Sequence, residues 1–183
     1  MTAAKRSAPR DSEGDGQLLA RVAQGDTAAL GTLYDRHAPS LLRFARRLDP
    51  QDAEDIVQTT FLRVLQLAPS FEPQTASARP WLFAITTRVA QERRRKLRRW
   101  TAALLRLSEL PRRAAPAIAD TRSDLDRSLA QLSAAKRTVL VLAEVEGFSC
   151  EEIARMLSIP IGTVWTRLHH ARRELRRREE GEP

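Results

Sequence analysis

Residues 148–175, FSCEEIARMLSIPIGTVWTRLHHARREL, contain the pattern that decides the fold. Ser149 and Glu152 lie three residues apart just before an apolar run, which is the spacing of a capping box at a helix N-terminus. A turn at residues 158–160 precedes a second helix, in which apolar residues recur along one stripe. The stripe consists of Val164, Leu168, Ala171 and Leu175. A capped helix, a tight turn and a second helix with basic outer faces predict a helix-turn-helix.

The alternative for this segment is an ordinary helical hairpin with a solvated basic face. Phe148 before the cap and Ile153 after it have the spacing of a hydrophobic staple, and Pro160 is suited to a first helical position. Because the cap, the staple, the turn and the polar face agree, the sequence favours the DNA-binding motif.

The stretch EEIARMLSIPIGTVWTRLHHARREL resembles the C-terminal DNA-binding domain of the extracytoplasmic-function (ECF) sigma factors. The shared pattern is EIA, an apolar turn, GTV, a short polar step with RL, and then AR and L. Response regulators and transposases have related helix pairs, so this motif alone leaves the function open. The resemblance implies that the second helix contacts the upstream (−35) promoter element through Thr163, Trp165, Thr166, Arg167, His169, His170 and Arg173.

Composition limits the fold and the location of the 183-residue chain. It is 42% hydrophobic but only 5% aromatic, so we expect an all-α protein with a core of Leu, Ala, Val and Ile. The single cysteine excludes an internal disulfide, and no cluster of Cys and His has the spacing of a zinc site. No apolar run is long enough to span a membrane and the N-terminus does not resemble a signal peptide, which predicts a cytoplasmic protein. The family resemblance implies a bacterial one.

The predicted organisation is two small helical domains joined by a flexible linker, the second domain containing the helix-turn-helix. We expect a disordered tail at 1–14, a domain at 15–100, a linker at 101–122, a domain at 123–178 and a tail at 179–183. In the first domain the sequence predicts one helix from Asp15, a second capped by Asp26 and a third from about Pro39 to Leu48. His37 is expected at a helix end.

A fourth helix is predicted to begin at Asp49-Pro50, an N-cap residue followed by a proline. Its buried stripe is Ala53, Ile56, Val57, Phe61 and Val64. The opposite face is acidic and polar with Leu62 in its middle, which is either a stray surface leucine or part of a docking face. The stretch DAEDIVQTTFLRV resembles the segment with which ECF sigma factors bind bacterial RNA polymerase. That resemblance implies polymerase contacts from Asp52, Asp55, Gln58, Thr59, Leu62 and Gln66.

The loop FEPQTASARP at 71–80 leads into a helix whose predicted core stripe is Leu82, Ile85 and Val89. Phe83 and Thr87 are expected to point away from that stripe, ahead of a dense arginine tract. Aromatic rings can stack on bases while arginines neutralise phosphates, so this surface suits melted DNA. The alternatives are a solvated helix end for the tract and a core position for Trp81 or Phe83. The resemblance implies contacts with the downstream (−10) element from Phe71, Trp81, Phe83, Thr87, Arg88, Gln91, Arg94 and Arg95.

These features together predict a sigma factor that binds core RNA polymerase and promoter DNA and promotes strand opening. We expect a monomer when free, a cognate anti-sigma factor, no membrane insertion, no catalytic residue, no metal and no cofactor. The net charge of +8 is concentrated in residues 88–99 and 167–178, as expected for two sites that bind a polyanion. Two alternatives remain at this stage: a homodimeric helix-turn-helix regulator of duplex DNA, and a regulator that binds polymerase without opening promoters.

Overall fold

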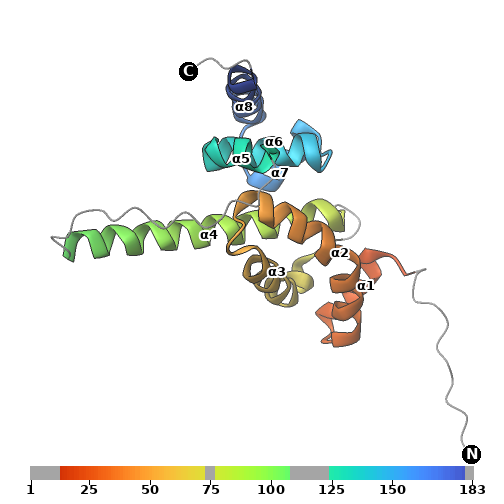
Figure 1. The fold of residues 1–183 in the computed structure, drawn as a ribbon. Coiled ribbons are helices and arrows are strands. Elements are labelled where there is room, and N and C mark those ends of the chain that lie inside the picture. Colours follow the sequence, from red (N-terminus) through yellow and green to blue (C-terminus); the bar gives the residue numbers. More distant parts are fainter. Residues whose placement is uncertain (1–12, 73–76, 108–123, 180–183) are drawn as a thin grey trace, which may run out of the picture.

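The computed structural model describes residues 13–72, 77–107 and 124–179, and these residues form helices joined by short turns (Figure 1). The helices are α1 (Asp15–Ala23), α2 (Thr27–Leu48), α3 (Ala53–Leu67), α4 (Ala78–Leu107), α5 (Asp124–Gln131), α6 (Ala134–Leu140), α7 (Cys150–Leu157) and α8 (Ile161–Glu179). Within the described ranges there is no strand, so the all-α prediction is confirmed. Most of the expected tails and linker lies outside the described residues.

The helices form two groups, one at each end of the sequence. Helices α2 and α3 pack on the first half of α4, and α1 packs on α2 and α3 (Figure 1). On the other side, α5 and α6 contact α2, α7 contacts α4, and α8 packs on α6 and α7. The second half of α4 projects beyond both groups. It continues to Leu107, seven residues into the segment 101–122 that the sequence analysis assigned to the linker.

Helix α2 is one continuous element, which corrects the prediction of two helices divided near Pro39. Asp26 caps it as predicted, because its Oδ1 accepts hydrogen bonds from the backbone N–H groups of Ala28 (2.9 Å) and Ala29 (3.1 Å). Proline lacks an N–H and weakens a helix interior. Here the residues on both sides of it are buried on a shared face, and this packing outweighs the local break. They are Ala29, Leu33, Ala38, Leu41, Phe44, Ala45 and Leu48.

His37 lies in the middle of α2 rather than at a helix end. Its imidazole is only 8% exposed and its Nε2 lies 2.8 Å from Oδ2 of Asp15 in α1. Arg36 pairs with the same carboxylate. Because one carboxylate joins two residues of α2, this cluster attaches α1 to the longer helix.

Helix α3 starts at Ala53, four residues after the predicted cap. Residues 50–52 form a turn, and Asp52 rather than Asp49 occupies the N-cap position. The carboxylate of Asp52 makes no capping bond, since it accepts a hydrogen bond from Nε of Arg93 in α4 at 3.3 Å. The predicted stripe of α3 is nevertheless buried in full.

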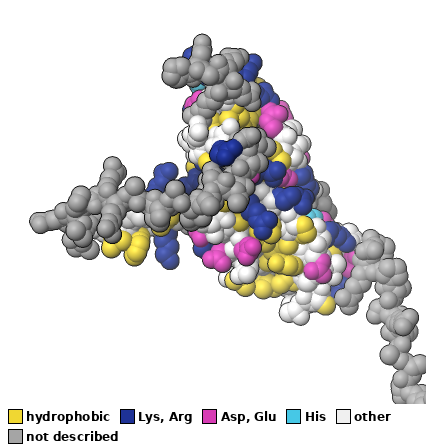
Figure 2. Space-filling model, viewed as in Figure 1, with side chains coloured by type: hydrophobic (Ala, Val, Ile, Leu, Met, Phe, Trp, Pro, Cys, Tyr) yellow, Lys and Arg dark blue, Asp and Glu magenta, His cyan; other side chains and the backbone are white. Residues whose placement is uncertain are grey.

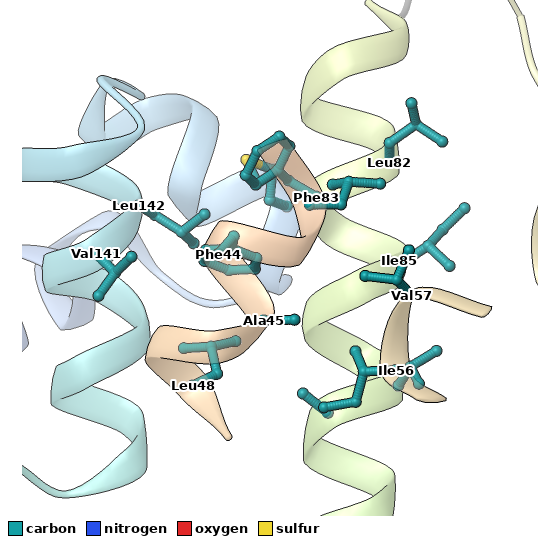
Figure 3. Packing of buried hydrophobic residues seen from close by; sticks show 14 of the residues in the cluster. Phe44, Ala45, Leu48, Ile56, Val57, Leu82, Phe83, Ile85, Val141 and Leu142 are labelled. Carbon is teal, nitrogen blue, oxygen red and sulfur yellow. The ribbon is translucent and has the colours of Figure 1, made fainter. Parts of the chain in front are cut away.

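The two groups share one hydrophobic core, whereas separate apolar sets were expected. Phe83 of α4 lies between Phe44 of α2 and Phe148 before α7, with ring centroids 5.0 and 5.2 Å away. Figure 3 shows Phe44 between Phe83 on one side and Leu142 of the second group on the other. Both partners of Phe83 are almost fully buried, so the contact between the groups is a packed core.

The helix-turn-helix agrees with its prediction in most details. Ser149 Oγ accepts the N–H of Glu152 at 3.2 Å, while Oε2 of Glu152 accepts the N–H of Ser149 at 2.8 Å, which is the capping box. Helix α7 ends at Ser158, whose φ of 53° is left-handed. Pro160 lies one residue before α8 instead of at its first position, and its carbonyl accepts the N–H of Thr163 at 2.9 Å.

Candidate polymerase and nucleic-acid interfaces

The polar face of α3 is exposed, with a leucine at its centre. Leu62 is 62% exposed, more than any other leucine in the described part of the chain. Asp55, Gln58 and Gln66 are exposed beside it, whereas Thr59 is half-buried. Figure 2 shows hydrophobic side chains gathered over α3 on the face in view. An apolar centre in a polar ring is the usual layout of a protein-binding patch.

Two of the predicted polymerase contacts are already paired within the chain. Arg93 of α4 donates to Asp52 at 3.3 Å and to Asp55 at 3.0 Å. The hydrogen bond that Arg93 donates to Asp52 is the largest cause that raises the pKa of the Arg93 guanidinium above its ordinary value. Arg63 of α3 pairs with Glu92 of α4 at 2.6 Å. These pairs orient α3 on α4, and a partner that binds the carboxylates must compete with Arg93.

A pocket next to the α3 face contains residues that the sequence-based prediction missed. It has a volume of about 480 Å³ and is bounded by α2 and α3. Tyr34 is 43% exposed, and its ring packs at a tilt against Phe61 with centroids 4.8 Å apart. Pro39 and Glu54 also line the pocket, together with Gln58 of the predicted face.

The predicted −10 surface on α4 is only partly exposed. Leu82, Ile85 and Val89 are buried as predicted, but Phe83 is 0% and Thr87 1% exposed. The expectation that Phe83 and Thr87 point to solvent is therefore wrong. The reason is that α4 is covered by α2 and α3 on one side and by the second group on the other.

The remaining −10 candidates fall into two places. The rings of Phe71 and Trp81 pack at a tilt with centroids 5.1 Å apart, and both residues are half-buried. Arg88 lies further along α4, and its Nη2 is 3.5 Å from Oγ of Ser158. Trp81 and Arg88 line one pocket together with Glu152 and Arg155 of α7. Further along, Gln91 and Arg95 are exposed and Arg94 is half-buried.

The −35 candidates on α8 mostly lie on open surface. Trp165 is 56% exposed, and Thr166, His169, His170 and Arg173 are also exposed. Thr163 and Arg167 are half-buried. The stripe formed by Val164, Leu168 and Ala171 is buried against the rest of the second group. The hydroxyl of Thr166 donates to the Gly162 carbonyl at 2.8 Å, and the rings of His169 and His170 lie edge to face at 5.6 Å.

Arg79 at the start of α4 is the main polar contact between the two groups. Its Nη2 donates to the backbone carbonyl of Glu146 at 2.9 Å and lies 3.3 Å from Oε2 of the same residue. Its guanidinium also lies 4.4 Å from the ring centroid of Phe148 and 5.1 Å from that of Phe83. Burial raises the pKa of the Glu146 carboxyl, and attraction to Arg79 lowers it only in part.

Neither a metal site nor a membrane span is found in the described part of the chain. No group of three His, Cys, Asp or Glu side chains is placed to hold a metal ion. None of the described helices is both long and apolar enough to cross a bilayer.

Two family models match the chain in succession. Residues 33–101 match Sigma-70 region 2, and residues 122–175 match Sigma-70, region 4. The first range contains α3 and most of α4, and the second contains the helix-turn-helix.

Curated relatives align over most of the chain. It is 38% identical over 169 residues to the ECF RNA polymerase sigma factor SigL of Mycobacterium tuberculosis, covering 86% of this chain and 94% of that protein. It is 34% identical to the RNA polymerase sigma factor CarQ of Myxococcus xanthus, covering 86% and 93%.

Solved structures share the fold. The structure of CnrH in complex with the cytosolic domain of CnrY aligns with a TM-score of 0.67 at 26% identity, covering 93% of this chain and 100% of that one. The sigma factor RpoE in complex with the anti-sigma factor NepR, from Bartonella quintana, aligns with a TM-score of 0.65 at 28% identity, covering 79% and 92%.

Proposed function

Because this chain belongs to the ECF family of RNA polymerase sigma factors, we propose that it binds core RNA polymerase and directs initiation at promoters with matching −35 and −10 elements. The observation that carries the proposal is that two exposed faces, on α3 and on α8, lie within the region 2 and region 4 matches of one chain. A homodimeric regulator of duplex DNA would need only the second match.

In this proposal each surface has its own partner. The α3 face, centred on Leu62, binds polymerase, and the exposed side of α8 binds the −35 element in the major groove. The half-buried pair Phe71 and Trp81, with Arg88 and the arginines that follow it on α4, binds the −10 strand. The chain supplies binding and strand separation, contributes no chemical step of its own, and acts in the bacterial cytoplasm.

Binding of the −10 strand by Phe83 or Thr87 requires a rearrangement. Both side chains are buried beneath the second group of helices, so the described arrangement is closed toward DNA. We expect polymerase and promoter to bind an arrangement in which α5 to α8 have left α4. A partner that binds the closed arrangement better would shift the population away from DNA binding. An anti-sigma factor, such as the one bound to the Bartonella quintana relative, is the kind of partner expected.

The proposal is tested first by removing the centre of the α3 face. A Leu62→Ala, Asp55→Ala double variant should bind core polymerase roughly tenfold more weakly or worse, as expected when an apolar anchor at an interface is truncated. The matched control is Val145→Ala with Glu151→Ala, which removes an exposed apolar residue and an exposed acid from the other helix group. Binding is measured by fluorescence anisotropy of the labelled chain, with thermal melts to show that both variants fold.

The two outcomes separate the proposal from its alternatives. Equal polymerase affinity for the double variant and the wild-type chain would contradict the assignment of the α3 face. In a reconstituted transcription assay on a matching promoter, the wild-type chain should give specific transcripts. Polymerase binding without any transcript would instead indicate a regulator that docks but does not open promoters.

A further inference from the structure

A pocket between the two helix groups combines parts of both predicted DNA-binding segments. It has a volume of about 340 Å³, within the usual range of small-molecule sites. Its lining comes from α2, α4, α6, the turn after α7, and α8. Four of the lining residues are arginines and none is an acid. They are Arg94, Arg95, Arg98 and Arg167.

We propose that this pocket binds a small molecule that carries two or more phosphate groups. The guanidinium group is planar and doubly donating, which matches phosphate oxygens. Arg95, Arg98 and Arg167 make no ion pair with any residue in the described ranges, so their charges are available to a ligand. Bringing like charges together costs free energy that a bound polyanion removes.

Two details of the lining favour a built site over a chance gathering of arginines. Arg94 is held in place by a hydrogen bond from its Nη2 to the carbonyl of Leu48 at 2.8 Å. Thr87, 1% exposed and also part of the lining, has a hydroxyl with no hydrogen-bond partner among the described residues. A buried hydroxyl without a partner is costly, and a phosphate oxygen would accept a hydrogen bond from it.

The shape of the pocket favours a small ligand over a DNA backbone. It lies where α4 faces α6 and α8, and its other walls combine polar side chains with apolar side chains of both groups, among them Leu48, Leu157 and Ile159. Such walls suit the ring of a nucleotide, and the arginines suit its phosphates. Free inorganic polyphosphate has the phosphates but no ring.

Binding at this place would hold the closed arrangement. Arg94 and Arg95 belong to the predicted −10 segment and Arg167 to the predicted −35 helix, so one anion would join both. Binding of a phosphate compound in this pocket does not depend on the proposed function. Only the effect of that binding on promoter recognition rests on the proposed function. A ligand that binds the closed arrangement alone stabilises it by mass action.

The test uses the full chain and tripolyphosphate as the probe. At about 0.15 M salt, where charges on open surface are largely screened, calorimetric titration should give one site per chain and the melting temperature should rise. Arg98→Gln should weaken this binding about tenfold or more, because one charge-assisted contact is lost. The control is Arg99→Gln, which removes the same charge from a neighbouring residue that does not line the pocket and should change affinity less than twofold. Ala135→Glu, which adds a carboxylate to the lining, should abolish binding.

Further ligands identify the source of the phosphates and give the outcomes that count against the proposal. Tighter binding of a nucleoside triphosphate than of tripolyphosphate assigns a nucleotide, and equal binding assigns inorganic polyphosphate. Equal losses for Arg98→Gln and Arg99→Gln would overturn the site, because only overall charge would then matter. The site would also be overturned if sulfate bound as tightly as tripolyphosphate at equal ionic strength. The same holds if single-stranded DNA bound and none of the small phosphate compounds did.

Discussion

The predicted DNA-binding faces of α4 and α8 were inferred in the same way, yet the structure treats them differently. On α8 only one stripe is buried, and the side chains on the other faces are mostly exposed. On the first half of α4 burial extends around most of the helix. It includes Leu82, Phe83, Ile85, Thr86, Thr87, Val89 and Ala90.

The difference comes from the number of neighbours that each helix has. Helix α8 packs mainly on α6 and α7, so one apolar stripe suffices. Helix α4 packs on α2 and α3 and also on α7, so a second face must be apolar as well. A face that carries Phe83 is compatible with stacking on a base or with packing on Phe148. Its sequence does not distinguish these two partners.

The largest predicted effect tests whether the α4 face is core in solution. Phe83→Ala removes a ring that packs between Phe44 and Phe148, and we expect it to lower the free energy of unfolding by about 3–5 kcal/mol. Trp165→Ala, which truncates an exposed aromatic residue of α8, should lower it by less than about 0.5 kcal/mol. Denaturant titration of both variants measures the difference.

Similar small effects for Phe83→Ala and Trp165→Ala would show that the second group does not cover α4 in solution. The difference in burial between α4 and α8 would then not hold in solution. A loss of stability near the expected size for Phe83→Ala, with an unchanged m-value, would support the closed arrangement and the shared core.

The helix-turn-helix could be predicted because all of its determinants are local. The Ser149–Glu152 box, the staple of Phe148 and the stripe beginning at Val164 lie within the quoted 28-residue stretch. The same holds for the buried stripe of α3 and the exposure of Leu62, since each depends on a single helix period.

The features that could not be predicted depend on contacts between distant residues. Asp52 and Asp55 look like free acids in the sequence, but Arg93 pairs with them from 41 and 38 residues away. Phe148 was assigned to a staple alone, whereas its ring also covers Phe83 and Arg79. No local pattern identifies such partners, because the chain pairs them only when α4 meets α3 and the second group.

The second-largest predicted effect is the loss of stability of the second helix group when it is expressed without α4. A fragment of residues 123–183 retains the buried stripe of α8 and its partners in α6 and α7, so it should unfold cooperatively in a thermal melt followed by circular dichroism. It loses the ring of Phe83, which packs on Phe148. We therefore expect it to be less stable than the full chain and to bind more of a dye that detects apolar surface. A fragment without a cooperative transition would show that the group depends on the shared core for folding.

A smaller effect tests the polar contact at the boundary between the groups through pH. Burial is the main cause that raises the pKa of Glu146 above its value in the unfolded chain, and attraction to Arg79, Arg47 and Arg43 opposes it only in part. The folded state therefore binds a proton more readily, so this residue adds stability as pH falls from neutral through the raised pKa. Glu146→Gln removes that contribution. The melting temperature of the wild type minus that of the variant should increase as the pH is lowered from 7 to 5. A difference that is constant or falls over this range would contradict the burial of the carboxyl.

The smallest effect concerns the exposed face of α8 and its two histidines. Neutral histidine offers one donor and one acceptor but no fixed charge. His170→Arg supplies a permanent charge, so it should steepen the log–log salt slope by about one unit if the side chain reaches a phosphate. If it reaches a guanine edge instead, affinity should rise by about 1–3 kcal/mol at one base position only. Anisotropy titrations with labelled duplexes over a range of salt concentrations distinguish these results. Identical affinity and salt slope for wild type and His170→Arg would show that this exposed residue does not face DNA, and that the open face of α8 is wider than the part that DNA contacts.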